Sequence, residues 1–277
     1  METDITTRLT TLGHPQRLAV FRLLMRRYPD QVPAGELAQA LDIKASTLSA
    51  YLSALTQAGL VTQHRIATSL QYSIAMDAVN ATFQDLYNDC CRGRPDLCAP
   101  APLGHNAMTQ TVYNVLFICT GNSARSIFAE SILRKEAGDR FAAYSAGTVP
   151  RSELNPFALD VLRQKGHDIS VLESKNVSVF TGPDAPAFDF VFTVCDQAAN
   201  EECPAWSGQP VSAHWGMPDP VKATGTDAEK SLAFQRAYGA LHNRIKLFTA
   251  LPLASLDRMS LQKAVDDIGR NKEETTQ

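Results

Sequence analysis

The sequence predicts two domains, an N-terminal α+β domain and a C-terminal α/β domain built on a parallel sheet. The chain has 277 residues, enough for two cores of ordinary size. Apolar residues recur at mostly helical spacing before residue 92, whereas strand and helix patterns alternate after residue 111. The stretch between them is rich in Pro, Gly and small residues, which is typical of a linker. We therefore assign residues 1–91 to the first domain, 92–111 to a linker and 112–277 to the second domain.

Charge and hydropathy narrow the classes of function. The net charge of −3 argues against a strongly basic, non-specific nucleic-acid binder, but residues 8–74 carry seven Lys/Arg against three acids, which suits phosphate contacts. No apolar run approaches the ~20 residues that span a bilayer, and METDITTRLT lacks the apolar region of a secretory signal. We expect a cytoplasmic protein with no membrane partner. Its cysteines should then serve catalysis, redox chemistry or ligand binding rather than structural disulfides.

The first domain reads as helices followed by one hairpin. The predicted elements are helices at 14–28, 32–41, 44–60 and 77–89, and a hairpin at 61–75. Gly59 is a plausible helix stop, and the hairpin alternates around a Thr68-Ser69 turn. Two short helices joined by a tight turn and followed by a hairpin are typical of a winged helix-turn-helix domain.

Small polar residues on the second of these helices, with a basic wing, could reach phosphates and base edges of DNA. The residues expected to contact DNA are Ser46, Thr47, Ser49 and Ser53 on the helix, and His64 and Arg65 in the wing. The stretches LGHPQRLAVFRLL and ELAQALDIKASTLSAYLSALTQAGLV, with the wing, resemble the ArsR-type winged-helix repressors of arsenical resistance. The resemblance implies operator DNA as a partner and a homodimer joined partly through the last helix. The alternative is an oligomerisation module that does not touch DNA.

The most informative stretch is VYNVLFICTGNSARSIFAESILRK, residues 112–135, which places a strand, a loop and a helix in succession. Cys119 and Arg125 have C-x5-R spacing, so the loop can wrap its N–H groups around a tetrahedral oxyanion while the arginine clamps two of its oxygens. These groups should lower the pKa of Cys119 and make it a nucleophile. The other positions expected to bind the anion or support the loop are Thr120, Gly121, Asn122, Ser123, Ala124 and Ser126. The alternative for Cys119 alone is an inert buried cysteine.

This loop, with AYSAGT (143–148), FVFTVCDQAANEECP (190–204) and AHWGMPDP (213–220), resembles the low-molecular-weight tyrosine phosphatase fold and its arsenate reductase branch. The implied fold is a parallel sheet covered by helices on both faces, with the anion loop at its carboxyl edge. Three features favour a reductase: Ala124 stands where phosphatases have a second cysteine, no tyrosine follows Asp219-Pro220, and Cys195 and Cys203 lie together after a strand. A phosphatase tethered to a DNA-binding domain stays open.

The resemblance implies a thiol relay without a tightly bound cofactor. Cys119 would attack arsenate while Asp219 protonates the leaving oxygen. Cys195 would then displace arsenite, and Cys203 would form a disulfide with Cys195 that an external reductant opens. Relatives coupled to thioredoxin space this pair as C-x6-C, whereas this chain has C-x7-C. We expect thioredoxin rather than glutaredoxin, with another thiol system still open. In some relatives a potassium ion supports the loop, and the ammonium of Lys175 could replace it here.

Three cysteines remain, Cys90, Cys91 and Cys98, in DCCRGRPDLC at the start of the linker. Arsenite binds three sulfurs, and soft thiolates select thiophilic centres. Some ArsR-type repressors carry arsenite-binding cysteines in this CC…C form after the winged helix. The alternatives are another thiophilic metal such as zinc, or no ligand. The whole sequence therefore predicts an arsenite-responsive repressor fused to an arsenate reductase. The main rival is a reductase whose N-terminal domain only oligomerises.

Overall fold

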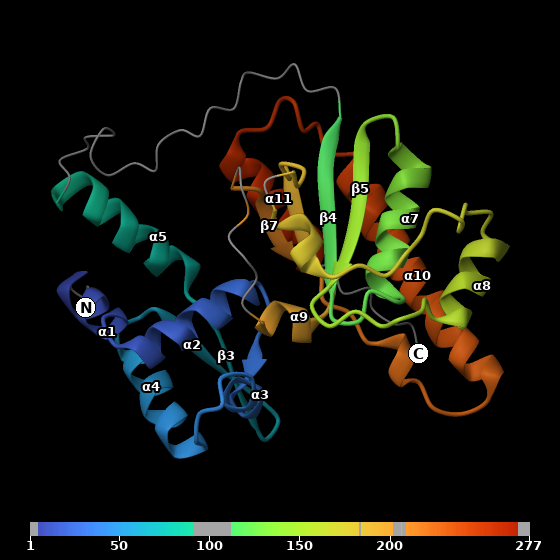
Figure 1. The fold of residues 1–277 in the computed structure, drawn as a ribbon. Helices are drawn as coiled ribbons and strands as arrows, with labels where there is room; N and C mark the ends of the chain where they lie inside the picture. The colour runs from blue at the N-terminus through green and yellow to red at the C-terminus, as the bar shows by residue number, and fades with distance from the viewer. Residues whose placement is uncertain (1–4, 91–111, 183, 202–205, 207–208, 271–277) are drawn as a thin grey trace. The chain divides into compact units, whose positions relative to one another are not determined.

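The chain folds into two compact units, Met1–His105 and Asn106–Gln277 (Figure 1). The computed structural model describes residues 5–90, 112–182, 184–201, 206 and 209–270. Cys91, Cys98 and Cys203 fall outside these ranges. Within them, no helix combines the length and apolar character needed to cross a membrane.

The N-terminal unit is a winged helix-turn-helix domain, as predicted. Its elements are α1 (Ile5–Leu12), α2 (Pro15–Arg26), β1 (Val32–Pro33), α3 (Ala34–Ala40), α4 (Ala45–Gln57), β2 (Val61–Ile66), β3 (Ser69–Ile74), α5 (Met76–Asp85) and a π-helical turn, η1 (Leu86–Cys90). The strands form an antiparallel sheet in the order β1-β3-β2. Helices α3 and α4 pack together and form the helix-turn-helix, and β2 and β3 form the wing.

Apolar side chains at helical spacing build the core of this unit. Leu48, Leu52 and Leu55 are buried on one face of α4, which packs against α2. This face is the one the sequence pattern predicted. Gly59 has a φ of 71°, a left-handed conformation that glycine adopts at little cost, so it ends α4 as expected.

Two details of the first unit differ from the sequence prediction. Helix α1 was not predicted, and it buries no residue; Arg8 ties it to α5 by donating to the carbonyl of Ala78 at 3.1 Å. The hairpin turn lies at Ala67–Thr68, one position earlier than expected, with Ala67 in the left-handed region.

The C-terminal unit is an α/β domain with a four-stranded, fully parallel sheet in the order β5-β4-β6-β7. Its strands are β4 (Tyr113–Cys119), β5 (Phe141–Gly147), β6 (Phe190–Thr193) and β7 (Val211–His214). Its helices are α7 (Arg125–Ala137), α8 (Pro156–Gln164), η2 (Val177–Phe180), α9 (Asp196–Asn200), η3 (Pro220–Lys222), α10 (Asp227–Thr249) and α11 (Arg258–Arg270). This is the predicted fold class.

Helices pack on the sheet and on one another, and the segments that follow three of its strands lie at its carboxyl edge. Helix α7 packs on β4 and β5, α10 packs on α7 and α8, and α11 packs on β7 (Figure 1). Trp215 is fully buried and stacks on Phe192 with ring centroids 4.1 Å apart. Because the strands are parallel, the segments that follow β4, β6 and β7 meet at the carboxyl edge, where open α/β sheets place ligands.

Candidate active site

In the segment that joins β4 to α7, residues 119–125, most backbone carbonyls accept hydrogen bonds from groups outside the loop. The neighbouring segment, residues 148–155, donates backbone N–H groups to the carbonyls of Cys119, Thr120, Gly121 and Ser123 at 2.9–3.1 Å. The carbonyl of Ala124 accepts from Phe128 within α7. A loop whose carbonyls are held on its outer side can present N–H groups on its inner side, which is the arrangement that binds an oxyanion.

Cys119 lies at the centre of this loop and is 3% exposed. Its Sγ lies 2.9 Å from Oγ of Ser126 and accepts the backbone N–H of Asn122 at 3.2 Å. Asn122 has a φ of 40°, a left-handed conformation that asparagine tolerates better than most residues, and this turns its N–H toward the sulfur. Ser126 therefore occupies the predicted position beside the thiol, and Ser123 supports the loop through its carbonyl.

The pKa of Cys119 differs from the sequence expectation. Burial raises the pKa of the Cys119 thiol above its ordinary value, and the nearby Cys195 raises it further. The hydrogen bond to Ser126 and the charge of Arg125 lower it, but they do not outweigh burial. The predicted lowered pKa is therefore wrong in direction, because the degree of burial cannot be read from loop spacing.

Behind the loop, a buried polar network fixes Asn122. Its Nδ2 donates to Oγ of Ser126 and of Ser145, each at 2.9 Å. Ser145 in turn donates to Glu130 at 2.6 Å, a carboxylate on α7 that is 2% exposed and also pairs with Arg134. The network links the loop to β5 and α7, so the shape of the loop depends on groups well outside it.

Lys175 contacts this network through its backbone. Its N–H donates to Oδ1 of Asn122 at 2.6 Å, whereas its ammonium lies 3.6 Å from a carboxylate oxygen of Glu173. The ammonium, which was expected to replace a potassium ion that supports the loop, lies near Glu173 instead. The backbone position of Lys175 is what supports the loop.

The glycine on which the loop depends sterically is Gly147, a residue that sequence reasoning did not single out. A Cβ on Gly147 would lie 2.7 Å from the carbonyl oxygen of Thr120 and 3.0 Å from Cβ of Asn122. At Gly121, which was expected to permit the close approach, a Cβ would meet its nearest neighbours at 3.6 Å, an ordinary contact. Only the short AYSAGT stretch pointed to this part of β5.

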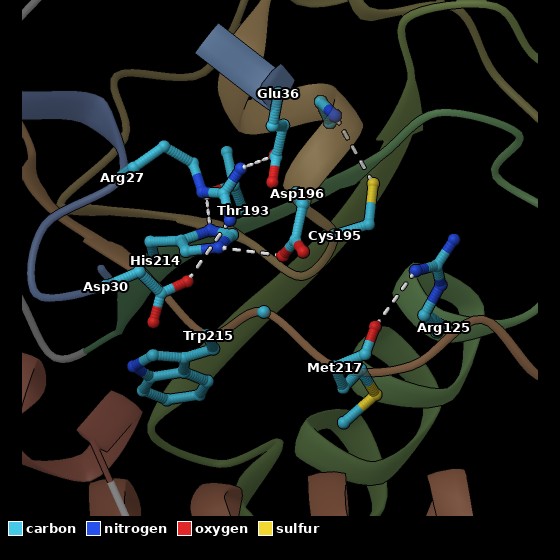
Figure 2. A network of polar contacts seen from close by, with 12 residues as sticks. Arg27, Asp30, Glu36, Arg125, Thr193, Cys195, Asp196, His214, Trp215 and Met217 are labelled. Carbon is cyan, nitrogen blue, oxygen red and sulfur yellow. Dashed lines mark hydrogen bonds and ion pairs between the residues drawn. The ribbon is translucent and has the colours of Figure 1, made fainter. Parts of the chain in front are cut away.

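Arg125 and Asp219, which were both predicted to be catalytic residues, are in contact. The guanidinium of Arg125 lies 3.0 Å from Oδ2 of Asp219. It also donates to the carbonyl of Met217 at 3.2 Å (Figure 2). The other oxygen of Asp219 accepts the N–H of Val221 and caps η3. Asp219 therefore sits beside the anion loop with its carboxylate fixed at both oxygens.

A cavity of about 400 Å³ opens beside the loop. It is lined by Ser123 of the loop, by residues 151–156 and by Val221, two positions after Asp219. The cavity therefore runs between the anion loop and the Asp219 turn, where a substrate could enter.

Cys195 is the N-cap residue of α9 and lies next to the anion loop. It is 1% exposed, its Sγ accepts the N–H of Ala198 at 3.4 Å, and it lies 3.4 Å from Oγ1 of Thr120. His214 fixes the flanking residues: its ring nitrogens lie 2.8 Å from Oγ1 of Thr193 and 3.2 Å from Oδ1 of Asp196 (Figure 2). A second thiol thus lies near the first, at the N-terminus of α9.

The N-terminal unit places the predicted DNA-contact residues on its surface. Exposed are Ser46, Ser49, Ser53 and Arg65, and half-buried are Thr47 and His64. Nε2 of His64 lies 3.2 Å from Oγ of Ser73, so its ring leans on the neighbouring strand. Cys90 is exposed at the end of η1, while its proposed partners Cys91 and Cys98 lie outside the described residues.

Fold and site together define the class. A cysteine at a strand end, a loop whose carbonyls are bonded from outside, and an arginine that begins the next helix characterise thiol-dependent enzymes that act on tetrahedral oxyanions. Residues 114–261 match the family model for low molecular weight phosphotyrosine protein phosphatases, and residues 12–64 match a helix-turn-helix domain. The chain belongs to the low molecular weight phosphotyrosine protein phosphatase family.

Within that family, the chain is similar to proteins named arsenate reductase. One from Bacillus licheniformis is 41% identical over 140 residues, which cover 50% of this chain and 94% of that protein. One from Bacillus subtilis is 37% identical over 134 residues, covering 48% and 93%. A solved thioredoxin-dependent arsenate reductase from Corynebacterium glutamicum shares 23% identity with a TM-score of 0.40, covering 80% of this chain and 96% of that one.

Proposed function

We propose that the C-terminal unit is an arsenate reductase. The observation that carries this proposal is the second thiol: Cys195 lies beside the anion loop, in contact with Thr120, and close enough to Cys119 to raise its pKa. A phosphatase needs one cysteine in such a site, whereas reduction of arsenate needs two electrons, which a pair of thiols supplies. The similarity to proteins named arsenate reductase supports the same conclusion.

The first step forms a bond between sulfur and arsenic. The sulfur of Cys119 attacks monohydrogen arsenate, and an arsenic–oxygen bond breaks. The thiol proton and the hydroxyl of arsenate leave together as water, with Asp219 carrying the proton to the leaving oxygen. Arg125 and the loop N–H groups stabilise the charge on the remaining oxygens. Burial raises the pKa of Cys119. Because the thiol proton leaves during the attack, a free thiolate does not have to form first.

The second step is the reduction. The sulfur of Cys195 attacks the sulfur of Cys119, and the electron pair of the sulfur–arsenic bond stays on arsenic. Arsenic passes from the +5 to the +3 state, arsenite leaves with the proton of Cys195, and a Cys119–Cys195 disulfide remains. Cys203 then attacks Cys195, releases Cys119 as a thiol and leaves a Cys195–Cys203 disulfide. A dithiol reductant of the thioredoxin class, or a glutaredoxin in its place, supplies the two electrons that reopen it.

The test is arsenate-dependent oxidation of NADPH, coupled through thioredoxin and thioredoxin reductase. Wild type should turn over. Cys119→Ser should be inactive, and Cys195→Ser and Cys203→Ser should fail in multiple turnover. A parallel assay with glutaredoxin and glutathione identifies the reductant. Hydrolysis of p-nitrophenyl phosphate that survives loss of both Cys195 and Cys203, without arsenate reduction by wild type, would identify a phosphatase instead.

We further propose that the N-terminal unit is a repressor that releases operator DNA when arsenite, the product of the C-terminal unit, binds Cys90, Cys91 and Cys98. The helix-turn-helix match supports DNA binding, as do the exposed hydroxyls on α4 and Arg65 in the wing. Cys90 is the last residue of η1, which follows directly on α5, so arsenite could pull on the end of that helix and change the spacing of two α4 helices in a homodimer.

The experiment is fluorescence anisotropy of the reduced protein on DNA from its own promoter, titrated with arsenite. Wild type should bind and be released. Cys90→Ser/Cys91→Ser should bind but not respond, and Cys119→Ser, which alters a thiol of the other unit, should respond as wild type does. Failure to bind DNA even at low salt would leave the N-terminal unit as an oligomerisation module.

A further inference from the structure

The turn that carries Asp219, residues 215–219, is held by two arginines from different helices. Arg244 of α10 donates through Nη1 to the carbonyls of Trp215 and Gly216 at 2.8 and 3.3 Å. Arg125 of α7 donates to the next carbonyl, that of Met217, at 3.2 Å. Three successive carbonyls of this short turn thus face guanidinium groups.

Arg244 is 7% exposed, and placing a permanently charged side chain inside a protein is costly unless its N–H groups are bonded. Backbone carbonyls of the turn accept hydrogen bonds from the guanidinium of Arg244. The first residue of the turn is fixed separately, because Nε1 of the buried Trp215 donates to the carbonyl of Val265 at 3.0 Å. Gly216 leaves room for the arrangement, since a Cβ there would lie 2.5 Å from Nε2 of His214.

The far end of the turn is where the chemistry lies. Asp219 follows Met217 by two residues, pairs with Arg125 at 3.0 Å and accepts the N–H of Val221 at 3.2 Å. Its position therefore depends on the path of the backbone between Trp215 and Pro220. Arg125 holds that path near the carboxylate, at Met217, while Arg244 holds it at Trp215 and Gly216, where the turn begins.

We propose that Arg244 is a positioning residue for Asp219: it fixes the turn so that the carboxylate stays beside Arg125 and the leaving oxygen of the substrate. This inference rests on the proposed reductase function for its catalytic consequence. It makes a specific claim, namely that Arg244 acts through Asp219 and not on the anion loop, because its hydrogen bonds to the carbonyls of Trp215 and Gly216 hold the turn that carries Asp219.

The activity test is a double-mutant cycle on the full chain with Arg244→Met, Asp219→Asn and the double variant, read by thioredoxin-coupled arsenate reduction. Arg244→Met should lower kcat about tenfold or more, with the competitive inhibition constant of inorganic phosphate unchanged within about twofold, because phosphate reports on the loop. In the Asp219→Asn background, Arg244→Met should cause no further loss beyond about twofold. Independent, multiplicative losses, or weakened phosphate inhibition, would overturn the proposal.

Two further measurements keep the test decisive. Arg244→Lys retains a cation and can still donate to one carbonyl; it should recover part of kcat, and only when Asp219 is present. Hydrogen–deuterium exchange needs no activity: in Arg244→Met the amide of Val221 should exchange about tenfold faster, with the amides of residues 120–126 unchanged. Faster exchange of all amides across the C-terminal unit, or unchanged exchange at Val221, would contradict the positioning role of Arg244. If wild type reduces no arsenate, the proposed function fails, while the exchange result still decides the role of Arg244.

Discussion

Replacing Gly147 by alanine tests whether the close approach of β5 sets the shape of the anion loop. The added Cβ would stand 2.7 Å from the carbonyl oxygen of Thr120, and 3.0 and 3.1 Å from Cβ and N of Asn122. Favourable contacts lie at about 3.5–4.0 Å, so the carbonyl of Thr120 must retreat by roughly 0.8 Å. Overpacking of this kind costs about 1–3 kcal/mol of unfolding free energy. A displacement approaching 1 Å in the catalytic groups costs about 10²-fold in rate.

The assay compares Gly147→Ala with a matched control, Gly239→Ala. Gly239 lies within α10, and a Cβ there meets nothing within 4 Å, so alanine should stabilise the helix by about 0.5–1 kcal/mol. Both tryptophans, Trp206 and Trp215, belong to the C-terminal unit, so their fluorescence reports its unfolding in urea. Gly147→Ala should lose stability and about 10²-fold in kcat/KM for arsenate. Wild-type activity in Gly147→Ala would refute the claim that this contact sets the loop.

Three further predictions concern charge and protonation. Burial raises the pKa of Asp266 to about 6, so the folded state holds this proton more tightly than the unfolded chain, and the resulting stability is lost as pH rises from about 4 to that value. Between pH 5 and 7.5, the free energy of unfolding measured in urea should therefore fall less in Asp266→Asn than in wild type. Parallel plots of this free energy against pH would contradict the prediction. Glu130→Gln removes the buried charge that Ser145 bonds and should lower the unfolding free energy by about 1–3 kcal/mol; an unchanged urea midpoint would show that the charge is unimportant. Ser126 holds the pKa of Cys119 down against burial, so in Ser126→Ala the alkylation of Cys119 by iodoacetamide should reach its midpoint at higher pH, and a downward shift would exclude this role for the hydroxyl.

Local patterns predicted much of both units. The face formed by Leu48, Leu52 and Leu55 was visible as a helical period, and the C-x5-R spacing located the loop because strand, loop and helix N-terminus follow one another without interruption. The wing was predicted with its turn one residue too late. Sequence favours Asn or Gly for left-handed turn positions, and Ala67 gave no such signal.

The features that the sequence did not reveal depend on contacts between distant residues. The close approach of Gly147 to Thr120, and the contact of Arg244 with Trp215, join positions 27 and 29 residues apart, and neither pair shares a motif. The pKa of Cys119 was misjudged for the same reason, because burial is a sum over many neighbours. Helix α1 was missed because it buries no side chain and is tied to α5 through Arg8 instead.

The segment 148–155 has a consequence for how the loop meets its ligand. Because this segment already bonds the carbonyls of Cys119, Thr120, Gly121 and Ser123, the loop is ordered by the protein and does not wait for the anion to order it. Fixing one residue of a free backbone costs about 1–2 kcal/mol in conformational entropy, so a seven-residue loop that folded only on binding would weaken affinity severely. Here that cost is met during folding, and association with a small oxyanion should approach the rate set by diffusion and charge rather than by loop closure.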